Sequence, residues 1–194
     1  MNKIFLTITL FFVLFLNFGC SAPGVLATSG GTTMVIAEGD RSVGEVIDDA
    51  TIKLQIAGKF ISSEESLFLD IDTSVINGRV LLTGIVDKQE TRISAVRRVW
   101  EVGGVKEVIN EIEVGDKTTL KEYSTDLWIN TQVKGIAAKT LGLRALSYNF
   151  ETIRGKVYIA GITSRKEQLN ELINSIENIK GVTEIVNYTI IKEE

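Results

Sequence analysis

The stretch NGRVLLTGIVDKQE at 77–90 recurs as RGKVYIAGITSRKE at 154–167, a displacement of 77 residues that takes Gly78 onto Gly155. The same displacement aligns GVKEVIN at 104–110 with GVTEIVN at 181–187. An ungapped register of this length indicates an internal duplication. The sequence therefore predicts two small domains, and the stretch at 77–90 decides the fold of each.

The duplication sets the predicted domain boundaries. The first copy covers residues 43–115, the second covers 125–194, and the polar stretch at 116–124 links them. Before the first copy, the chain holds its only proline, several glycines and no periodic pattern, which is typical of a flexible tether. We assign this tether to residues 20–42.

Apolar residues change their period in the same order in both copies. A helix is expected first, over 45–60 and 125–141, because apolar side chains recur there at helical spacing. Two extended runs follow, the first of them expected over 67–76 in the first copy and 145–153 in the second, and they meet at Asn77–Gly78 and Arg154–Gly155. Asn-Gly between β-rich runs is a strong hairpin-turn signal, because both residues tolerate positive φ.

A second helix and a last strand complete each copy. This helix is expected to begin at a capping box and to end at a glycine C-cap: Asp87–Glu90 and Gly104 in the first copy, Ser164–Glu167 and Gly181 in the second. The predicted fold class is therefore α+β, with two tandem α-β-β-α-β domains. Each is expected to form a three-stranded mixed sheet backed by two helices.

The first nineteen residues read as a secretory signal. Lys3 is followed by an almost unbroken apolar segment from Ile4 to Leu16 and then by small or polar residues. This is the order of a signal peptide, and the apolar segment is shorter than the roughly 20 residues of a membrane span. Residues 1–19 are therefore predicted to be removed on export.

Cys20 is the only cysteine, so it cannot close an intramolecular disulfide, and the chain has no histidine to activate its thiol. Its position after Gly19, at the end of the apolar segment, resembles a bacterial lipobox. That resemblance implies acyl chains on Cys20, and Ser21 implies sorting to the outer membrane. The alternative is cleavage after Ala27, which would leave a soluble periplasmic protein.

The residue types argue against an enzyme. Lack of histidine removes the commonest general base and the commonest metal ligand. Carboxylate pairs such as Asp48–Asp49 and Glu64–Glu65 are adjacent in sequence and diverge, and SGG at 29–31 precedes no phosphate-binding unit. Predicted export and the net negative charge of the chain argue against nucleic acid as a partner. We expect no catalytic residue, no cofactor and no metal.

The repeated glycines resemble those of the BON domain. Gly78 and Gly84 lie around the second strand, as Gly155 and Gly161 do in the second copy, and G-V-x-x-V/I follows the second helix. Two such domains behind a lipobox resemble the DolP-type lipoproteins of Gram-negative bacteria, whereas OsmY-type proteins share the domains but lack the acyl anchor. The glycines expected at structural turns are Gly78, Gly84, Gly104, Gly155, Gly161 and Gly181.

The two copies differ in charge. Residues 45–115 hold eight basic and thirteen acidic residues, a net −5, whereas residues 125–191 hold eight basic and six acidic residues, a net +2. On the first helix of the second copy, a wheel with Ile129 inward turns a tryptophan and small or apolar residues outward, between lysines. The outward residues are Leu127, Trp128, Thr131, Lys134, Gly135, Ala138 and Lys139.

Two interpretations of this outward face are open from the residues alone. It suits a lipid headgroup region, with the indole at the interface and lysines on phosphates. It also suits packing against the first domain, whose first helix has a second apolar row at Ala50, Leu54, Ala57 and Ile61. The resemblance favours lipid, because DolP-type proteins contact anionic phospholipid through this helix, and it implies Trp128 and Lys134 as contacts. Trp100, by contrast, continues an apolar row and is expected in the core or a domain interface.

The sequence thus predicts a monomeric, lipid-anchored protein on the periplasmic face of the outer membrane. It is expected to bind anionic phospholipid such as phosphatidylglycerol or cardiolipin and to support envelope integrity. The alternative is a soluble periplasmic OsmY-type stress protein with chaperone-like binding of envelope clients. A third possibility is a structural partner of another envelope protein, docking through the Ala50 and Leu54 face.

Overall fold

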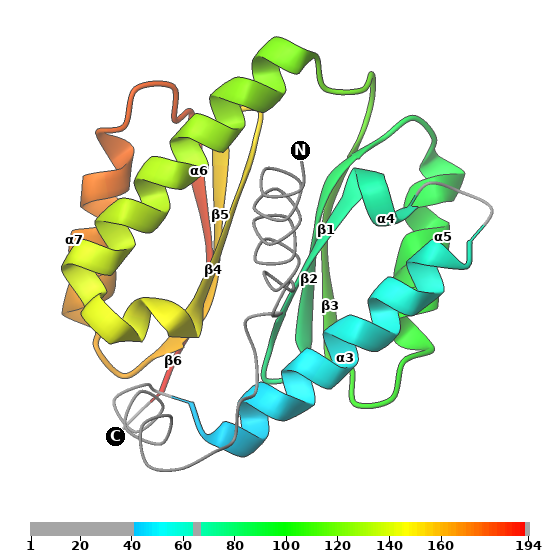
Figure 1. Cartoon of the computed structure of the whole chain (residues 1–194), viewed down its shortest axis with the longest axis horizontal. Coiled ribbons are helices and arrows are strands. Elements are labelled where there is room, and N and C mark those ends of the chain that lie inside the picture. Colours follow the sequence, from blue (N-terminus) through cyan, green and yellow to red (C-terminus); the bar gives the residue numbers. More distant parts are fainter. Residues whose placement is uncertain (1–40, 64–66, 193–194) are drawn as a thin grey trace, which may run out of the picture. The chain divides into compact units, whose positions relative to one another are not determined.

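The computed structural model describes residues 41–63 and 67–192. The predicted signal peptide, Cys20 and the tether up to residue 40 lie outside these ranges. The described residues repeat one order of helices and strands twice (Figure 1). This confirms the predicted α+β fold of two α-β-β-α-β units.

The first copy builds a three-stranded mixed sheet with two main helices on one of its faces (Figure 1). Strand β1 pairs antiparallel with β2, and β2 pairs parallel with β3. The elements are α3 (Val43–Ile61), α4 (Leu67–Asp70), β1 (Ile71–Ile76), β2 (Arg79–Val86), α5 (Gln89–Trp100) and β3 (Glu107–Val114).

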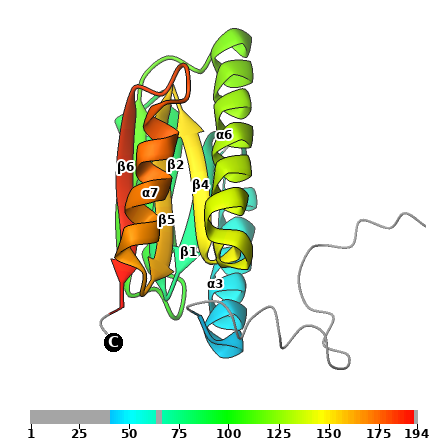
Figure 2. The same cartoon turned by 90° about the vertical axis from the view of Figure 1, so that its left-hand side faces the viewer.

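The second copy repeats this sheet with β4 antiparallel and β6 parallel to the central β5. Figure 2 shows α7 lying over β5 and β6, while α6 runs beside β4. The elements are α6 (Leu120–Leu141), the 3₁₀ helix η1 (Gly142–Ser147), β4 (Tyr148–Ile153), β5 (Lys156–Thr163), α7 (Lys166–Glu177) and β6 (Glu184–Ile191).

Capping boxes are found at α3 and α6, not at the helices where the sequence predicts them. Glu45 donates its backbone N–H to the Ser42 hydroxyl, and its carboxylate accepts from the Ser42 N–H at 2.7 Å. Thr119 and Glu122 make the same pair of bonds at α6. These bonds hold the pKa of both glutamates below its ordinary value. Each box satisfies two N–H groups that a helix start would otherwise leave unpaired.

The predicted capping boxes at Asp87 and Ser164 are wrong. Helices α5 and α7 begin after Lys88 and Arg165, and neither cap side chain bonds to the helix. The N-cap of each helix lies one residue later than predicted. Glu90 and Glu167 therefore follow their N-caps by two residues, whereas a capping box requires three.

The glycine positions need a second correction. Helices α5 and α7 end at Glu101 and Asn178, so Gly104 and Gly181 are not C-caps and lie in the turn before the last strand. Gly84 and Gly161 lie inside β2 and β5 and not at turns.

Three predicted boundaries also shift. The extended run expected at 67–76 begins with the short helix α4, and the run expected at 145–153 begins within η1. Helix α6 begins at Leu120, inside the stretch predicted as linker. At η1 and at the start of α6, a helical turn occupies residues that the sequence pattern assigned to a strand and to the linker.

Each hairpin turn is tied to the first helix of its copy by a buried carboxylate. Asp49 accepts the N–H of Asn77 at 2.7 Å and of Gly78 at 2.8 Å. Asp126 accepts the N–H of Arg154 and of Gly155, both at 2.8 Å. All four turn residues have positive φ, between 50° and 76°, as the predicted two-residue hairpin turn requires.

The same turn also holds the last strand. The Gly78 carbonyl accepts the Lys106 N–H at 2.8 Å, and the Gly155 carbonyl accepts the Thr183 N–H at 2.9 Å. A Cβ atom on Gly155 would lie 2.5 Å from the Gly181 carbonyl oxygen, so only glycine fits against that backbone. The turn therefore joins helix, hairpin and last strand at one point.

The apolar side chains form three cores. One core in each copy lies between its helices and its sheet. The third joins the opposite faces of the two sheets through Ile76, Leu81, Tyr158, Ala160 and Ile162. Across it Tyr188 donates to Glu111 at 2.5 Å, and these two residues are equivalent positions of the two copies. The copies therefore meet through their sheets with approximate twofold symmetry.

We expect Asp49→Ala to lower the free energy of unfolding by about 2–4 kcal/mol, because two turn N–H groups lose a charged acceptor in a buried place. Asp49 also pairs with Arg41, which adds to the loss. Urea denaturation followed by circular dichroism measures the change. The control is Asp48→Ala, which alters the exposed neighbouring carboxylate and should change stability by less than about 0.5 kcal/mol. Equal stability of the two variants would show that the turn does not depend on this carboxylate.

Candidate functional site

Helix α6 separates its residues sharply between core and solvent. Asp126, Ile129, Val133, Ala137 and Leu141 are buried against the sheet and α7. Trp128 and Leu127 are 53% and 56% exposed. All seven residues that the sequence analysis placed on the outward face are exposed: Leu127, Trp128, Thr131, Lys134, Gly135, Ala138 and Lys139.

Sequence reasoning missed the first turn of this surface. Leu120 is 83% exposed and Tyr123 is also exposed, and both precede the helix start that the sequence predicted. The capping box at Thr119 and Glu122 is the signal that would have revealed them. We define the α6 face as the seven predicted residues together with Leu120 and Tyr123.

The exposed apolar surface continues past the helix. Leu143 and Leu146 in η1 are exposed, with Arg144 between them. Lys121 is exposed on the border of the α6 face that also carries Lys139. Together with Lys121 on its border, the α6 face therefore combines one indole, several aliphatic side chains and three lysines.

The third core, through which the copies meet, contains no residue of the α6 face and none of the apolar row of α3. The third core draws on strands, and Leu54 in the apolar row of α3 is 74% exposed. The α6 face is therefore not packed against the first domain in this core, and only its edge at Tyr123 and Leu127 lines a cleft shared with the first copy. The prediction for Trp100 is wrong, because this side chain is 52% exposed at the end of α5.

A cleft of about 370 Å³ lies beside α6, and its lining is acidic. Tyr123 and Leu127 of α6 form one side of it, Asp72 of β1 and Glu151 of β4 another. Burial raises the pKa of Glu151 to about 7, and the negative charge of Asp72 adds to the shift, while Lys134 and Lys53 oppose it. Burial also raises the pKa of Asp72. Two carboxylates make this cleft unsuitable for a phosphate.

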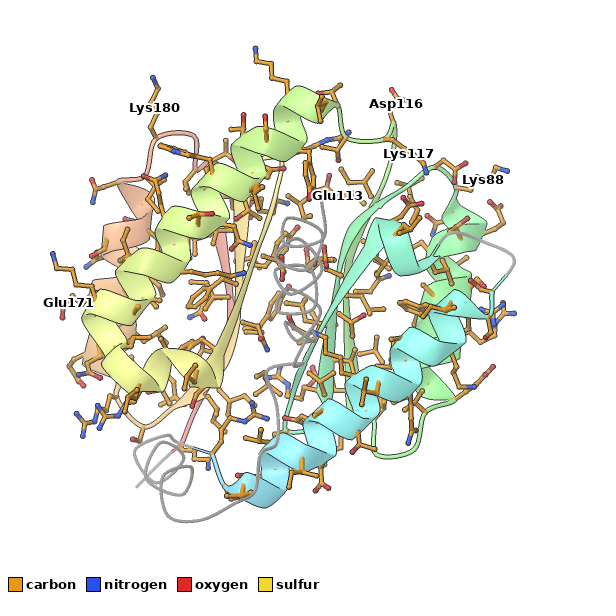
Figure 3. All side chains as sticks on the ribbon, in the orientation of Figure 1. Lys88, Glu113, Asp116, Lys117, Glu171 and Lys180 are labelled. Carbon is orange, nitrogen blue, oxygen red and sulfur yellow. The ribbon has the colours of Figure 1, made fainter. Side chains whose placement is uncertain are left out.

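The connection from β3 into α6 is held by polar contacts to both copies. Lys117 Nζ lies 3.3 Å from the carboxylate of Asp70, and Arg154 donates to the Asp116 carbonyl at 2.7 Å. Figure 3 shows Asp116 and Lys117 in this connection, with Glu113 on the strand before it. Arg154 Nη1 is also 3.8 Å from Glu113 Oε2. These contacts fix where α6 begins and so where its face starts.

The chemistry available elsewhere is limited. Residues 41–63 and 67–192 contain no group of three or more His, Cys, Asp or Glu side chains placed to hold a metal ion. Over the same described ranges, no helix has both the length and the hydropathy needed to cross a bilayer.

Comparison with known proteins identifies the repeat. The model of the BON-domain family matches residues 48–116 and 125–193. A protein of Anaplasma centrale, described as an uncharacterized protein in the gshII 5′ region, is 37% identical over 147 residues, which cover 75% of this chain and 96% of that protein.

Two further relatives come from Haemophilus and Actinobacillus. The outer membrane lipoprotein DolP of Haemophilus influenzae is 27% identical over 170 residues, covering 87% of this chain and 86% of DolP. The 21 kDa hemolysin of Actinobacillus pleuropneumoniae is 27% identical over 152 residues, which cover 76% of this chain and 78% of the hemolysin. Among solved structures, the C-terminal domain of CdsD, a structural protein of the type III secretion system of Chlamydia trachomatis, aligns with a TM-score of 0.29 and 11% identity over 72% of this chain and 96% of that domain.

The raised pKa of Glu151 predicts a pH-dependent stability. The folded chain holds this proton up to about pH 7, whereas an ordinary glutamate releases it near 4.5, so stability falls as the pH rises from 4.5 through 7. Glu151→Gln cannot ionise and should be more stable than the unmodified chain by about 1–2 kcal/mol at pH 8, with little difference at pH 4. Urea denaturation at the two pH values measures this.

The control for this measurement is Glu171→Gln, on the exposed surface of α7 (Figure 3). It removes the same kind of charge and should leave stability unchanged at both pH values. A Glu151→Gln advantage that is equal at pH 4 and pH 8 would mean that ionisation of this carboxyl is not the cause.

Proposed function

This chain belongs to the BON-domain family, and we propose that it is a non-enzymatic outer-membrane lipoprotein that binds anionic phospholipid through the α6 face. Similarity to an outer membrane lipoprotein over 87% of the chain supports the class and the location. The proposal adds the lipid, the surface and a role in envelope integrity. Phosphatidylglycerol and cardiolipin are the ligands expected from the charge of the second copy.

The observation that carries the proposal is the exposure of Trp128 next to Leu127 on a helix whose other side is buried in the core. An indole has a large apolar body and one N–H donor, so it gains most where one end meets acyl chains and the other meets water. An exposed Trp on a rigid helix is therefore suited to the headgroup region of a bilayer.

Lysines at the borders of the α6 face supply the preference for anionic lipid. Lys121 and Lys139 lie on the border nearer Trp128, and Lys134 lies on the opposite border. Each lysine near an anionic surface contributes about 1 kcal/mol, and this attraction is screened beyond roughly 10 Å. Leu120, Tyr123 and Leu127 add apolar area along the same side of the helix.

The acyl chains proposed on Cys20 provide the primary anchor. Residues 20–42 connect that cysteine to the start of α3, so the folded copies stay close to the membrane surface. A second, weaker lipid contact then adds discrimination between membrane regions more than it adds anchoring.

We expect the chain from residue 20 onward, carrying Cys20→Ser so that no acyl chain is present, to co-sediment with phosphatidylglycerol vesicles and not with phosphatidylcholine vesicles. Trp128→Glu should weaken binding by about tenfold or more, because a carboxylate replaces the indole at the interface. Lys134→Glu should weaken it several-fold, and this loss should shrink in high salt.

The chain offers two matched controls for this experiment. Trp100→Glu changes a tryptophan of nearly equal exposure on α5. Lys180→Glu reverses an exposed lysine in the turn after α7 (Figure 3). Both should bind vesicles like the unmodified chain. Equal losses in Trp100→Glu and Trp128→Glu would refute a lipid site on the α6 face.

Metabolic labelling tests the anchor separately. The exported chain should incorporate a palmitate analogue, and Cys20→Ser should abolish the label, because no other cysteine is present. Mass spectrometry of the mature N-terminus provides the second readout, with acylated Cys20 expected. An unlabelled mature chain that begins at Thr28 would instead support the soluble OsmY-type alternative.

A further inference from the structure

Helix α3 exposes an apolar row that no described residue covers. Its members alternate at intervals of four and three residues, which is the spacing of the buried seam in a coiled coil. Leu54, at its centre, is 74% exposed. We call this row the α3 seam: Val43, Ile47, Ala50, Leu54, Ala57 and Ile61. All are exposed except Ala57, which is half-buried.

The charged residues of α3 lie away from the seam. Asp49 is buried under the hairpin turn, Glu45 completes the capping box, and Lys59 pairs with Glu101 at 2.8 Å. Asp48 is exposed and lies about 100° around the helix from Ile47, the seam residue nearest to it on the helix surface. The positive charge of Lys53 lowers the pKa of the Asp72 and Glu151 carboxyls against the larger effect of burial. The arc of α3 that faces outward is therefore formed by apolar and small residues only.

We propose that the α3 seam docks on α3 of a second copy of this chain, with the two helices antiparallel and centred on Ile52. In that alignment Ala50 faces Leu54 of the other copy, Ala57 faces Ile47, and Val43 faces Ile61. Each alanine thus meets a larger side chain, which is the condition for knobs to fill holes. The contact is isologous, because each helix supplies the same residues in reverse order.

Small residues beside the seam allow the helices to approach closely. Gly44, Thr51 and Gly58 recur every seven residues along one edge of it. A Cβ atom on Gly58 would meet nothing within 4 Å, so this space is open to a partner. Close backbone approach benefits a second helix, whereas a lipid surface gains nothing from it.

Comparison with α6 argues for protein and against lipid as the occupant. At the positions where α6 carries Trp128 and Lys134, α3 carries Thr51 and Ala57. The seam therefore lacks the indole and the lysine that suit the α6 face to anionic lipid. Residues 45–115 also carry a net charge of −5, which opposes approach to anionic headgroups.

The seam is short, and this limits the strength of the contact. Nineteen residues of helix span about 28 Å, so a single helix pair buries less than the roughly 1,600 Å² of a standard interface. Residues 20–42 reach at most about 75 Å from an anchor at Cys20. Copies held in one membrane therefore meet at a high effective concentration, which offsets the small area. This step rests on the proposed anchor and departs from the monomer that the sequence predicts.

Cysteine cross-linking of the full chain tests the pairing. Two differently tagged chains are co-expressed, one with Ile47→Cys and the other with Ala57→Cys, and mild oxidation is followed by non-reducing electrophoresis. We expect the mixed 47–57 disulfide to exceed either self-linked product at least fivefold. Two residues at position 47 would lie about 15 Å apart, beyond the roughly 7 Å reach of a disulfide.

The duplication provides a matched control. Ser124→Cys and Lys134→Cys place the same pair on α6, at the positions equivalent to 47 and 57, and should not cross-link. Adding Leu54→Glu to both tagged chains should abolish the 47–57 product, because it buries a carboxylate in the seam. Dominant self-linked products, or a 47–57 yield no greater than that of the α6 pair, would overturn the proposal.

Two further arms separate this proposal from the lipid-binding function. The same pair in a Cys20→Ser background should cross-link several-fold less, because the copies are no longer concentrated on a membrane. A fluorophore attached at Leu54→Cys should not shift to the blue with phosphatidylglycerol vesicles, and a shift would assign the seam to lipid. Absence of cross-linking with intact vesicle binding would overturn the dimer and leave the α6 proposal standing.

Discussion

The carboxylate that accepts two N–H groups of the hairpin turn is the interaction on which each copy depends. It fixes the rotation of the first helix about its own axis, because Asp49 and Asp126 must both face their turns. Trp128 follows Asp126 by two residues, which is about 200° around the helix. The hydrogen bonds of the Asp126 carboxylate to the turn therefore also direct the Trp128 indole outward.

The packing of the two sheets against each other determines which surfaces of the copies remain exposed for binding. Because Glu111 and Tyr188 are equivalent positions and bond to each other, the two sheets cover one another symmetrically. This contact leaves Leu54 on α3 and Trp128 on α6 exposed. The duplication thus produces two equivalent helix surfaces, and substitution has made them different. One carries an indole and lysines, and the other carries an uncharged apolar seam.

Sequence reasoning predicts what depends on local pattern and repetition. The displacement of 77 residues, the Asn77–Gly78 turn and the inward row through Ile129 each depend on neighbouring residues, and the structure agrees with all three. The predicted capping boxes are wrong because Asp87-x-x-Glu90 and Ser42-x-x-Glu45 are alike as sequence patterns. Only the residue at which the helix begins shows which of them forms a capping box. Trp100 fails because a helical row does not reveal how far the partner surface extends.

The contact between the sheets is reflected in the sequences of the two central strands. Strand β2 is buried on both faces, and its run VLLTGIV is apolar at nearly every position, which is typical of a strand covered on two sides. The same holds for β5. A strand with one face in water would alternate apolar and polar residues. The outward direction of Trp128 was predictable from a helical wheel with Ile129 inward. The partner of the open sheet face could not be predicted in this way, because the second sheet that covers it is distant in sequence.

A weak lipid site on a tethered protein has a different consequence from a strong site on a free one. Acyl chains at Cys20, as proposed, would keep the chain at the bilayer, so the proposed lipid contacts of the α6 face would change its distribution within the membrane and not its attachment. One indole and three lysines provide only a few kcal/mol of attraction, which can be reversed by a modest change in lipid charge. Such a surface can respond to local lipid composition because its attraction is small, and a larger apolar face would bind all bilayers alike.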